Sequence, residues 1–216
     1  MSFLPPYFYF IVASFLASLI SFSLRDKSLN YLKLFPPFLF LTILIELIGT
    51  YRASLQKSTL LMYGFFTVVE FCFYLWFISM LIDQTRMRKA TRLAIPFYAV
   101  ISTINILFLQ INTFPTVTYA FGCLIIVAAC ILYFLELFRR PKYVRLTNNP
   151  AFWICSGLLF FYCCSFPLYG MTNLLRGISK LIIGNFYNII IILNIFLYTL
   201  FTIAFLCRLR TRKYTL

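Results

Sequence analysis

Seven long apolar runs restrict what this chain can fold into more than any other feature of its sequence. A helix that crosses a bilayer needs about 20 mostly apolar residues. The runs lie at about residues 7–24, 34–51, 59–82, 93–110, 115–138, 151–170 and 181–207. The connections between them are too short to hold a folded domain outside the membrane. The sequence therefore predicts an all-α, polytopic membrane protein whose residues 1–216 form one bundle of seven transmembrane helices.

The composition agrees with a bilayer as the solvent. Apolar residues make up 62% of the chain and charged residues only 11%, whereas soluble domains have about 45–50% and about 25%. In water such a chain would expose apolar patches far larger than monomeric proteins tolerate. The seven cysteines all fall inside apolar runs, where free cysteine acts as a small hydrophobic residue. They predict neither disulfides nor a metal site.

Prolines mark most of the expected helix starts. Proline is tolerated in the first turn of a helix, where its missing N–H has no intrahelical partner. Seven prolines lie at or near the beginning of a run, namely Pro5, Pro6, Pro36, Pro37, Pro96, Pro115 and Pro150. Pro167 lies inside the sixth run and should kink that helix.

The distribution of lysine and arginine predicts the orientation. Alternate connections carry 15 basic residues on one side of the membrane and 4 on the other. The positive-inside rule places the richer side in the cytoplasm of a cell (cytoplasmic or inner) membrane, with the N-terminus outside and the C-terminus cytoplasmic. The main topology anchors are Arg86, Arg88, Lys89, Arg139, Arg140, Arg208, Arg210 and Arg212. Because these charges form short clusters rather than a stripe, we expect no nucleic-acid partner.

The first apolar run lacks the features of a signal peptide. A signal peptide has a basic segment at its start, and no side chain before Arg25 is charged. We therefore expect this run to remain as the first spanning helix.

Several kinds of chemistry are absent from the sequence. The chain has no histidine, which excludes imidazole zinc sites, histidine-ligated haem and histidine-dependent hydrolases. No aspartate lies within a run, no lysine lies in the middle of the seventh run to bind retinal, and there is no glycine-rich phosphate loop. We therefore expect a protein that is not an enzyme and has neither a metal nor a cofactor.

Three glutamates fall within the apolar runs, and an ionisable residue in a span is a candidate functional residue because burying its charge is costly. Glu136 lies three and four residues before Arg139 and Arg140, so an ion pair at the membrane interface explains it. Glu70 lies about 16 Å from the outer end of the third run and Glu46 about 7–8 Å from that of the second, at 1.5 Å per residue. No lysine or arginine lies beside them in a span, but Arg52 and Arg176 lie at the outer rim and could reach inward. Otherwise Glu46 and Glu70 are expected to be protonated or to await a cationic ligand or a proton.

Other polar residues lie at similar depths near the outer side. They are Tyr63 on the third run, Asn105 on the fourth, and Asn185 and Asn188 on the seventh. With Glu46 and Glu70, they predict a pocket that opens to the outside and binds a ligand or a proton. Hydrogen bonds between helices are an equally good interpretation of the asparagines. Asn194 aligns instead with Tyr187 and Tyr198 on its helix, which favours a structural role.

Four segments resemble a family of seven-helix integral membrane proteins from Bacteroidota that has no established activity. They are Leu34–Pro37, Glu46–Gly49, Val69–Tyr74 and Phe152–Tyr162. The resemblance would cover nearly the whole chain. It implies the seven-helix fold and no particular function.

Three functions remain open at this stage. The leading hypothesis is a receptor- or sensor-like module that signals through a separate partner, in the cytoplasm or the membrane, because the chain carries no output domain. The second is a small-solute or proton-coupled transporter with three, one and three helices. The third is a structural or assembly subunit whose third run, with Phe66, Phe73 and Phe77 at helical spacing, faces another membrane protein or a second copy of the chain.

Overall fold

Helices make up nearly all of the described part of the chain. The computed structural model describes residues 4–23, 27–110, 115–139, 146–171 and 180–212, and these contain no β-strand. The α-helices are α1 (Tyr7–Ser23), α2 (Phe35–Ser54), α3 (Leu60–Leu81), α4 (Thr85–Ile104), α5 (Thr116–Arg139), α6 (Pro150–Met171) and α7 (Lys180–Arg212). Two short 3-10 segments, Lys27–Leu34 and Leu146–Asn148, and a π-helical segment, Asn105–Leu109, complete the order. The all-α prediction is confirmed for these residues.

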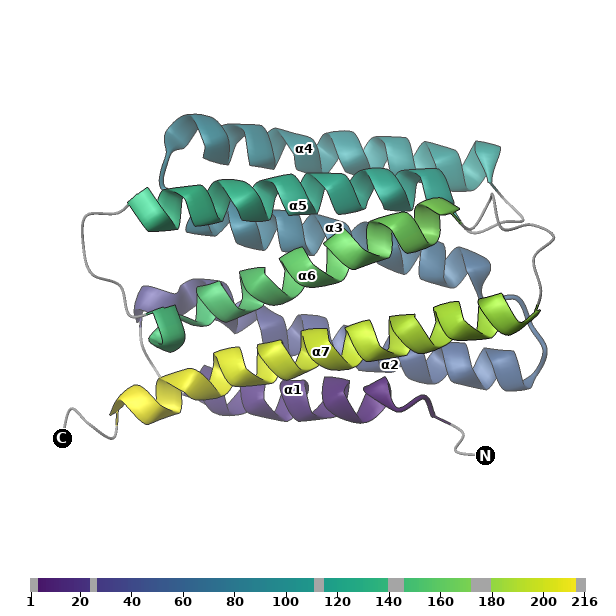
Figure 1. Ribbon diagram of the computed structural model, residues 1–216, viewed down its shortest axis with the longest axis horizontal. Helices are drawn as coiled ribbons and strands as arrows, with labels where there is room; N and C mark the ends of the chain where they lie inside the picture. The colour runs from purple at the N-terminus through teal and green to yellow at the C-terminus, as the bar shows by residue number, and fades with distance from the viewer. Residues whose placement is uncertain (1–3, 24–26, 111–114, 140–145, 172–179, 213–216) are drawn as a thin grey trace.

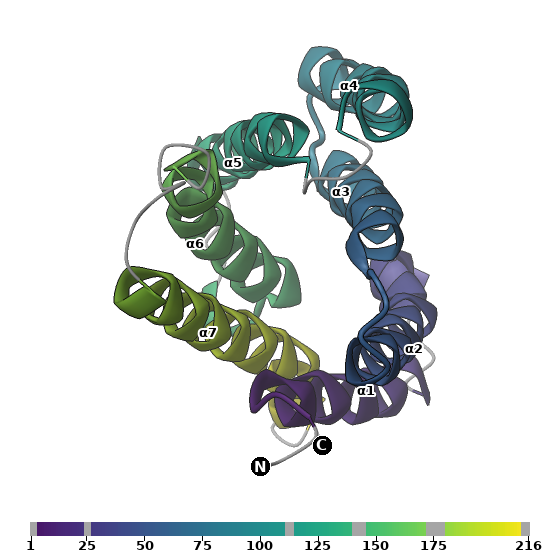
Figure 2. The same ribbon diagram turned by 90° about the vertical axis from the view of Figure 1, so that its right-hand side faces the viewer.

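The helices run up and down in one bundle, with the N-terminus and the C-terminus at opposite ends (Figure 1). Seen along the bundle, α1, α2, α3, α5, α6 and α7 form a ring that closes where α1 packs on α7 (Figure 2). Helix α4 lies outside this ring and packs on α3 and α5. The six helices of the ring therefore surround the middle of the bundle.

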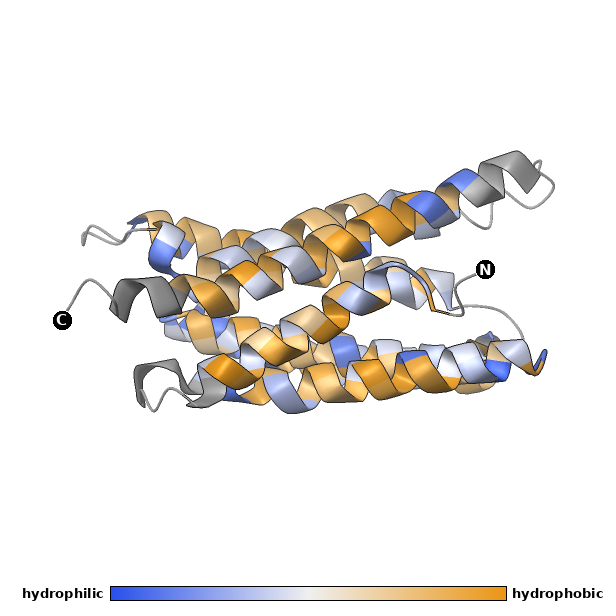
Figure 3. Cartoon of the chain, turned by 90° about the horizontal axis from the view of Figure 1, so that it is seen from below, coloured by the Kyte–Doolittle hydropathy of each residue, from blue (hydrophilic) through white to orange (hydrophobic). Residues whose placement is uncertain are grey.

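Six helices are long and apolar enough to cross a membrane, which is the pattern of a multi-pass membrane protein. Helix α1 is shorter, with 17 residues, or about 25 Å at 1.5 Å per residue. Large apolar side chains point outward, such as Leu93 and Val100 on α4 and, on the π-helical segment after it, Phe108, which is 75% exposed. Hydrophilic residues gather mostly toward the two ends of the bundle (Figure 3). Lipid accepts such an apolar exterior, whereas water does not.

Helix α4 begins earlier than the sequence pattern indicated. We expected a run from about residue 93 with Pro96 near its start, but α4 starts at Thr85 and Pro96 lies in its interior. The expected start was wrong because the arginines, lysine and alanine before Leu93 are themselves good helix formers. Helix α7 likewise continues through Arg212, five residues beyond the apolar run.

Glu136 explains how α4 can start at this point. Basic residues in the first turn oppose the helix dipole, and Gln84, at the N-cap position, provides no side-chain cap. The Glu136 carboxylate on α5 instead accepts hydrogen bonds from the backbone N–H groups of Asp83 (2.8 Å) and Gln84 (3.4 Å). Glu136 therefore joins α5 to the start of α4. The expected pairing with Arg139 stays a prediction, and Arg140 lies outside the described residues.

The turn between α2 and α3 is fixed by backbone hydrogen bonds. The Gln56 N–H donates to the Ala53 carbonyl and the Lys57 N–H to the Arg52 carbonyl, both at 3.0 Å. Gln56 has a φ of 54°, in the left-handed region that this type of helix ending requires. The turn places the last part of α2 against the first turns of α3, which brings Glu46 close to Tyr63.

Aromatic rings fill the half of the bundle near the C-terminus. Phe35, at the start of α2, packs edge to face on Phe73, Phe77, Phe201 and Phe205 at 5.0–5.7 Å between ring centroids. The faces of Phe38 and Phe73 stack at 3.9 Å. The aromatic face expected on the third run is thus occupied inside the bundle.

Candidate functional site

A cavity of about 700 Å³ lies in the middle of the helix ring. Its mouth, formed by Leu4–Pro6, Ala53, Thr59 and Leu60, lies at the end of the bundle where the N-terminus is drawn (Figure 1). The walls come from α1, α2, α3, α5, α6 and α7, and none of the described lining residues belongs to α4. The volume lies in the range of pockets that bind small organic molecules.

Glu46 lies on the wall of this cavity and accepts two hydrogen bonds from tyrosines. Its Oε2 atom is 3.2 Å from the Tyr7 hydroxyl and 3.3 Å from the Tyr63 hydroxyl. The two phenols come from α1 and α3, so one carboxylate on α2 connects three helices. Tyr63 reaches Glu46 because it passes directly over Gly49, where a Cβ atom would lie 2.7 Å from Tyr63 Cζ and still closer to its hydroxyl.

Glu70 lines the deep end of the same cavity. It is ten residues along α3 from Leu60, or about 15 Å below the mouth. Its side chain is partly exposed only because it borders the cavity. The phenols of Tyr74 and Tyr162 approach its carboxyl group, yet neither buried hydroxyl makes a hydrogen bond of ordinary geometry. At the deep end of the site, the Glu70 carboxyl group therefore lies beside two hydroxyl groups that could each still donate a well-formed hydrogen bond.

The cavity is closed toward the other end of the bundle. Its lining extends no further than Thr42 on α2, Glu70 on α3 and Tyr198 on α7. Just beyond these residues are the packed rings of Phe35, Phe38, Phe73, Phe77 and Phe201. Among the described residues, the aromatic rings thus close the site at this end.

The structure brings together three of the six residues that the sequence suggested for the pocket. Glu46, Glu70 and Tyr63 line the cavity. Asn105 lies away from it, between α4 and α5, where its Nδ2 atom donates to Gln110 Oε1 (2.9 Å) and Thr118 Oγ1 (3.1 Å). This geometry corresponds to the alternative interpretation, a hydrogen bond between helices.

Helix α7 turns a different face to the cavity from the one we expected. Asn185 and Asn188 are exposed and do not line it. Tyr187, Asn194 and Tyr198 line it instead, although the Asn194 amide also donates to the Ile190 carbonyl at 2.9 Å. Their alignment along one face was visible in the sequence, but apolar residues surround both faces, so the pattern did not reveal which one points inward.

Tyrosines are the cavity residues that sequence reasoning missed. Besides Tyr63, the lining contains Tyr7, Tyr119, Tyr169, Tyr187 and Tyr198. In the sequence they looked like other aromatic residues of apolar spans, which are common at membrane interfaces. Only their position on the inner side of the ring of helices distinguishes these tyrosines from the other aromatic residues of the spans.

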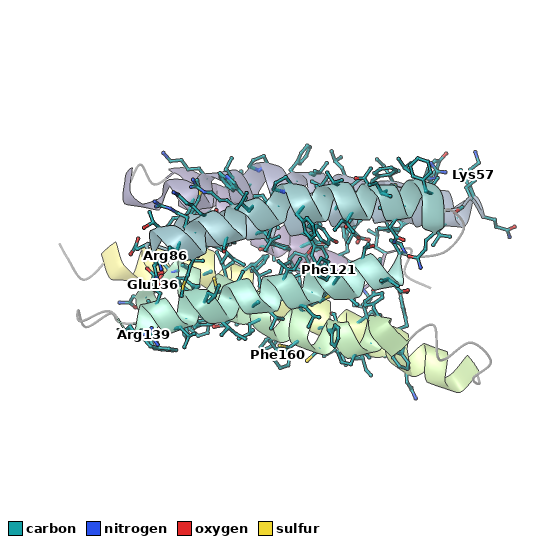
Figure 4. The ribbon with its side chains drawn as sticks, turned by 90° about the horizontal axis from the view of Figure 1, so that it is seen from above. Lys57, Arg86, Phe121, Glu136, Arg139 and Phe160 are labelled. Atoms are coloured by element: carbon teal, nitrogen blue, oxygen red, sulfur yellow. The ribbon has the colours of Figure 1, made fainter. Side chains whose placement is uncertain are left out.

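Basic residues lie at the ends of the bundle, away from the cavity. Figure 4 shows Arg86, Glu136 and Arg139 at one end and Lys57 at the other. Arg52, which we expected to be able to reach inward from the rim, is exposed and does not line the cavity, and Arg176 is outside the described residues. No described lining residue is a lysine or an arginine, and the described part of the chain holds no cluster of three potential metal ligands.

Comparison of the chain with known protein families, curated proteins and solved structures finds no match. The functional argument therefore starts from the chemistry of the cavity itself.

Proposed function

We propose that the protein is a receptor- or sensor-like module of the cell membrane that binds a small solute from the outer side. The observation that carries this proposal is the cavity inside the helix ring, which both glutamates line and which packed aromatic rings close toward the basic end. The excess of basic residues at the opposite end supports a cytoplasmic location for that end. The cavity would then face outward.

The bound state would be transmitted through the helices that share the site. Glu46 connects α1, α2 and α3 through two tyrosine hydroxyls, so a solute that competes for this carboxylate changes contacts between three helices. At the basic end, the start of α4 with Arg86, Arg88 and Lys89 offers a surface for an anionic region of a separate partner protein.

The test is to purify the tagged protein from its own membranes in mild detergent and to identify what accompanies it. We expect a partner protein in near-equal amount whose recovery or activity changes in Thr67→Trp, which fills the cavity at a buried lining residue. Val100→Trp, at a position that is 58% exposed on the outer face of α4, is the matched control. Recovery of the protein alone, or with itself only, would contradict the signalling proposal.

A small-solute or proton-coupled transporter is the second candidate, and one feature of the ring favours it. Helices α1–α3 form one half of the ring and α5–α7 the other, with α4 outside, as in a transporter of three, one and three helices. Transport requires the aromatic rings around Phe35 to open. Uptake of a labelled solute by reconstituted vesicles, abolished by Glu70→Gln, would favour this function over signalling.

A further inference from the structure

The charge of the cavity lining is unbalanced. Glu46 and Glu70 contribute two carboxyl groups, and none of the described lining residues is basic. A carboxylate taken out of water is stable only when it is paired with a positive charge or well hydrogen-bonded. The described residues supply hydrogen-bond donors to Glu46 but no cation to either glutamate. A cationic ligand would supply the positive charge that the two carboxylates lack in their ionised form.

The walls around the two carboxyl groups are aromatic. Six tyrosines and two phenylalanines, Phe66 and Phe161, line the cavity, and Tyr119 and Tyr169 pack together with ring centroids 4.2 Å apart. The face of an aromatic ring carries partial negative charge and attracts a cation within about 6 Å of its centre. Rings also provide apolar contact for carbon groups that surround the charge.

The deep end holds donors that can stabilise an ionised carboxylate. The hydroxyls of Tyr74 and Tyr162 are buried and approach Glu70, but neither makes a hydrogen bond of ordinary geometry. Leaving a buried donor unpaired is costly. A cation that holds Glu70 in its ionised form, and draws the helices slightly together, allows both hydroxyls to donate to the carboxylate.

We infer that the cavity binds an organic cation, an amine or quaternary ammonium compound, with its positive charge between Glu46 and Glu70 and its carbon groups against the tyrosines. This inference rests on the proposed function, because it names the class of solute that the cavity binds. The volume of about 700 Å³ is far larger than a metal ion or a proton requires, which favours an organic cation over an inorganic one.

The experiment uses the full chain in nanodiscs of uncharged (zwitterionic) lipid and measures binding of radiolabelled tetraethylammonium by equilibrium dialysis. Displacement is compared for three compounds of similar shape: choline, its neutral isostere 3,3-dimethylbutan-1-ol, and the anion 3,3-dimethylbutyrate. We expect one saturable site per chain, with choline at least about tenfold more effective than the other two.

Variants test whether the two glutamates make this site. Glu46→Gln and Glu70→Gln should each weaken tetraethylammonium binding by about tenfold or more, as expected for the loss of one charge-assisted contact. Glu136→Gln, at the far end of the bundle, should bind as the wild type does. A thermal unfolding curve for each variant shows whether it is folded.

Three results would overturn the inference, and all of them leave the proposed function separately testable. If the neutral or anionic compound binds as well as choline, or if both glutamine variants bind tetraethylammonium normally, the cavity binds a solute of another class. If no compound binds, the inference that the cavity binds an organic cation is wrong. Recovery of a partner protein that responds to Thr67→Trp would still support a receptor.

Discussion

Gly49→Ala tests the contact that connects α2, α3 and Glu46. Gly49 is buried on α2, and the Tyr63 ring passes directly over its Cα atom. A Cβ atom there would lie 2.7 Å from Tyr63 Cζ and 3.2 Å from Met62 Cε, with the Tyr63 hydroxyl nearer still. The ring would have to move, and its 3.3 Å hydrogen bond to Glu46 would break.

The expected magnitude follows from three effects. Overpacking of a well-packed site costs about 1–3 kcal/mol, and loss of the hydrogen bond about 1 kcal/mol. Alanine is favoured over glycine inside a helix by about 1 kcal/mol, which offsets part of the loss. We expect Gly49→Ala to lower the free energy of unfolding by about 1–3 kcal/mol, the overpacking cost remaining because the other two effects nearly cancel.

Gly64→Ala is the matched control, because it makes the same substitution one helix away. A Cβ atom at Gly64 would lie 3.6 Å from Ile106 Cδ1, an ordinary contact. We therefore expect this variant to be as stable as the wild type or more stable by up to about 1 kcal/mol.

The assay is reversible unfolding in mixed detergent micelles, followed by circular dichroism. The two alanine variants are measured alone, and Gly49→Ala is also combined with Tyr63→Leu, which removes the ring. In the Tyr63→Leu background, Gly49→Ala should no longer lower the free energy of unfolding. The reasoning would be refuted if Gly49→Ala were as stable as Gly64→Ala, or if its cost were unchanged without the Tyr63 ring.

Three further predictions concern other close contacts and turns of the bundle. Gly122→Ala should destabilise the protein by about 1–3 kcal/mol, because its Cβ atom would meet the Phe71 ring and lie 2.9 Å from Tyr98 Cε2; unfolding in micelles measures this, and a neutral effect would contradict the packing. Glu136→Ala should remove about 1 kcal/mol from the start of α4, seen as faster hydrogen exchange at residues 83–88, while unchanged exchange would show that the carboxylate does not cap the helix. Gln56→Gly should stabilise the turn after α2 by up to about 1 kcal/mol, because glycine adopts a positive φ without strain, and a lower melting temperature would count against it.

The sequence predicted the helices well and the pocket only in part. The apolar runs placed all seven α-helices, with the main error at the start of α4, where good helix formers extend the helix beyond the apolar segment. Glu46, Glu70 and Tyr63 could be proposed because an ionisable or polar group in a span is unusual. The other cavity tyrosines could not be proposed, because an aromatic residue in an apolar span is ordinary wherever it points.

The sequence by itself determined that the chain is helical and apolar enough for a membrane, where its helices lie, and which connections carry the basic residues. These properties depend on local composition along the chain, which is read directly. Only the tertiary structure decided which face of each helix points inward. When lipid surrounds the bundle, the inner and outer faces are almost equally apolar, so hydrophobic periodicity does not set the rotation of a helix. Packing between helices sets the rotation of each helix instead. Gly49 on α2 and Tyr198 on α7 are examples, because close contacts turn these faces toward the cavity. The same packing places the tyrosines around the two glutamates.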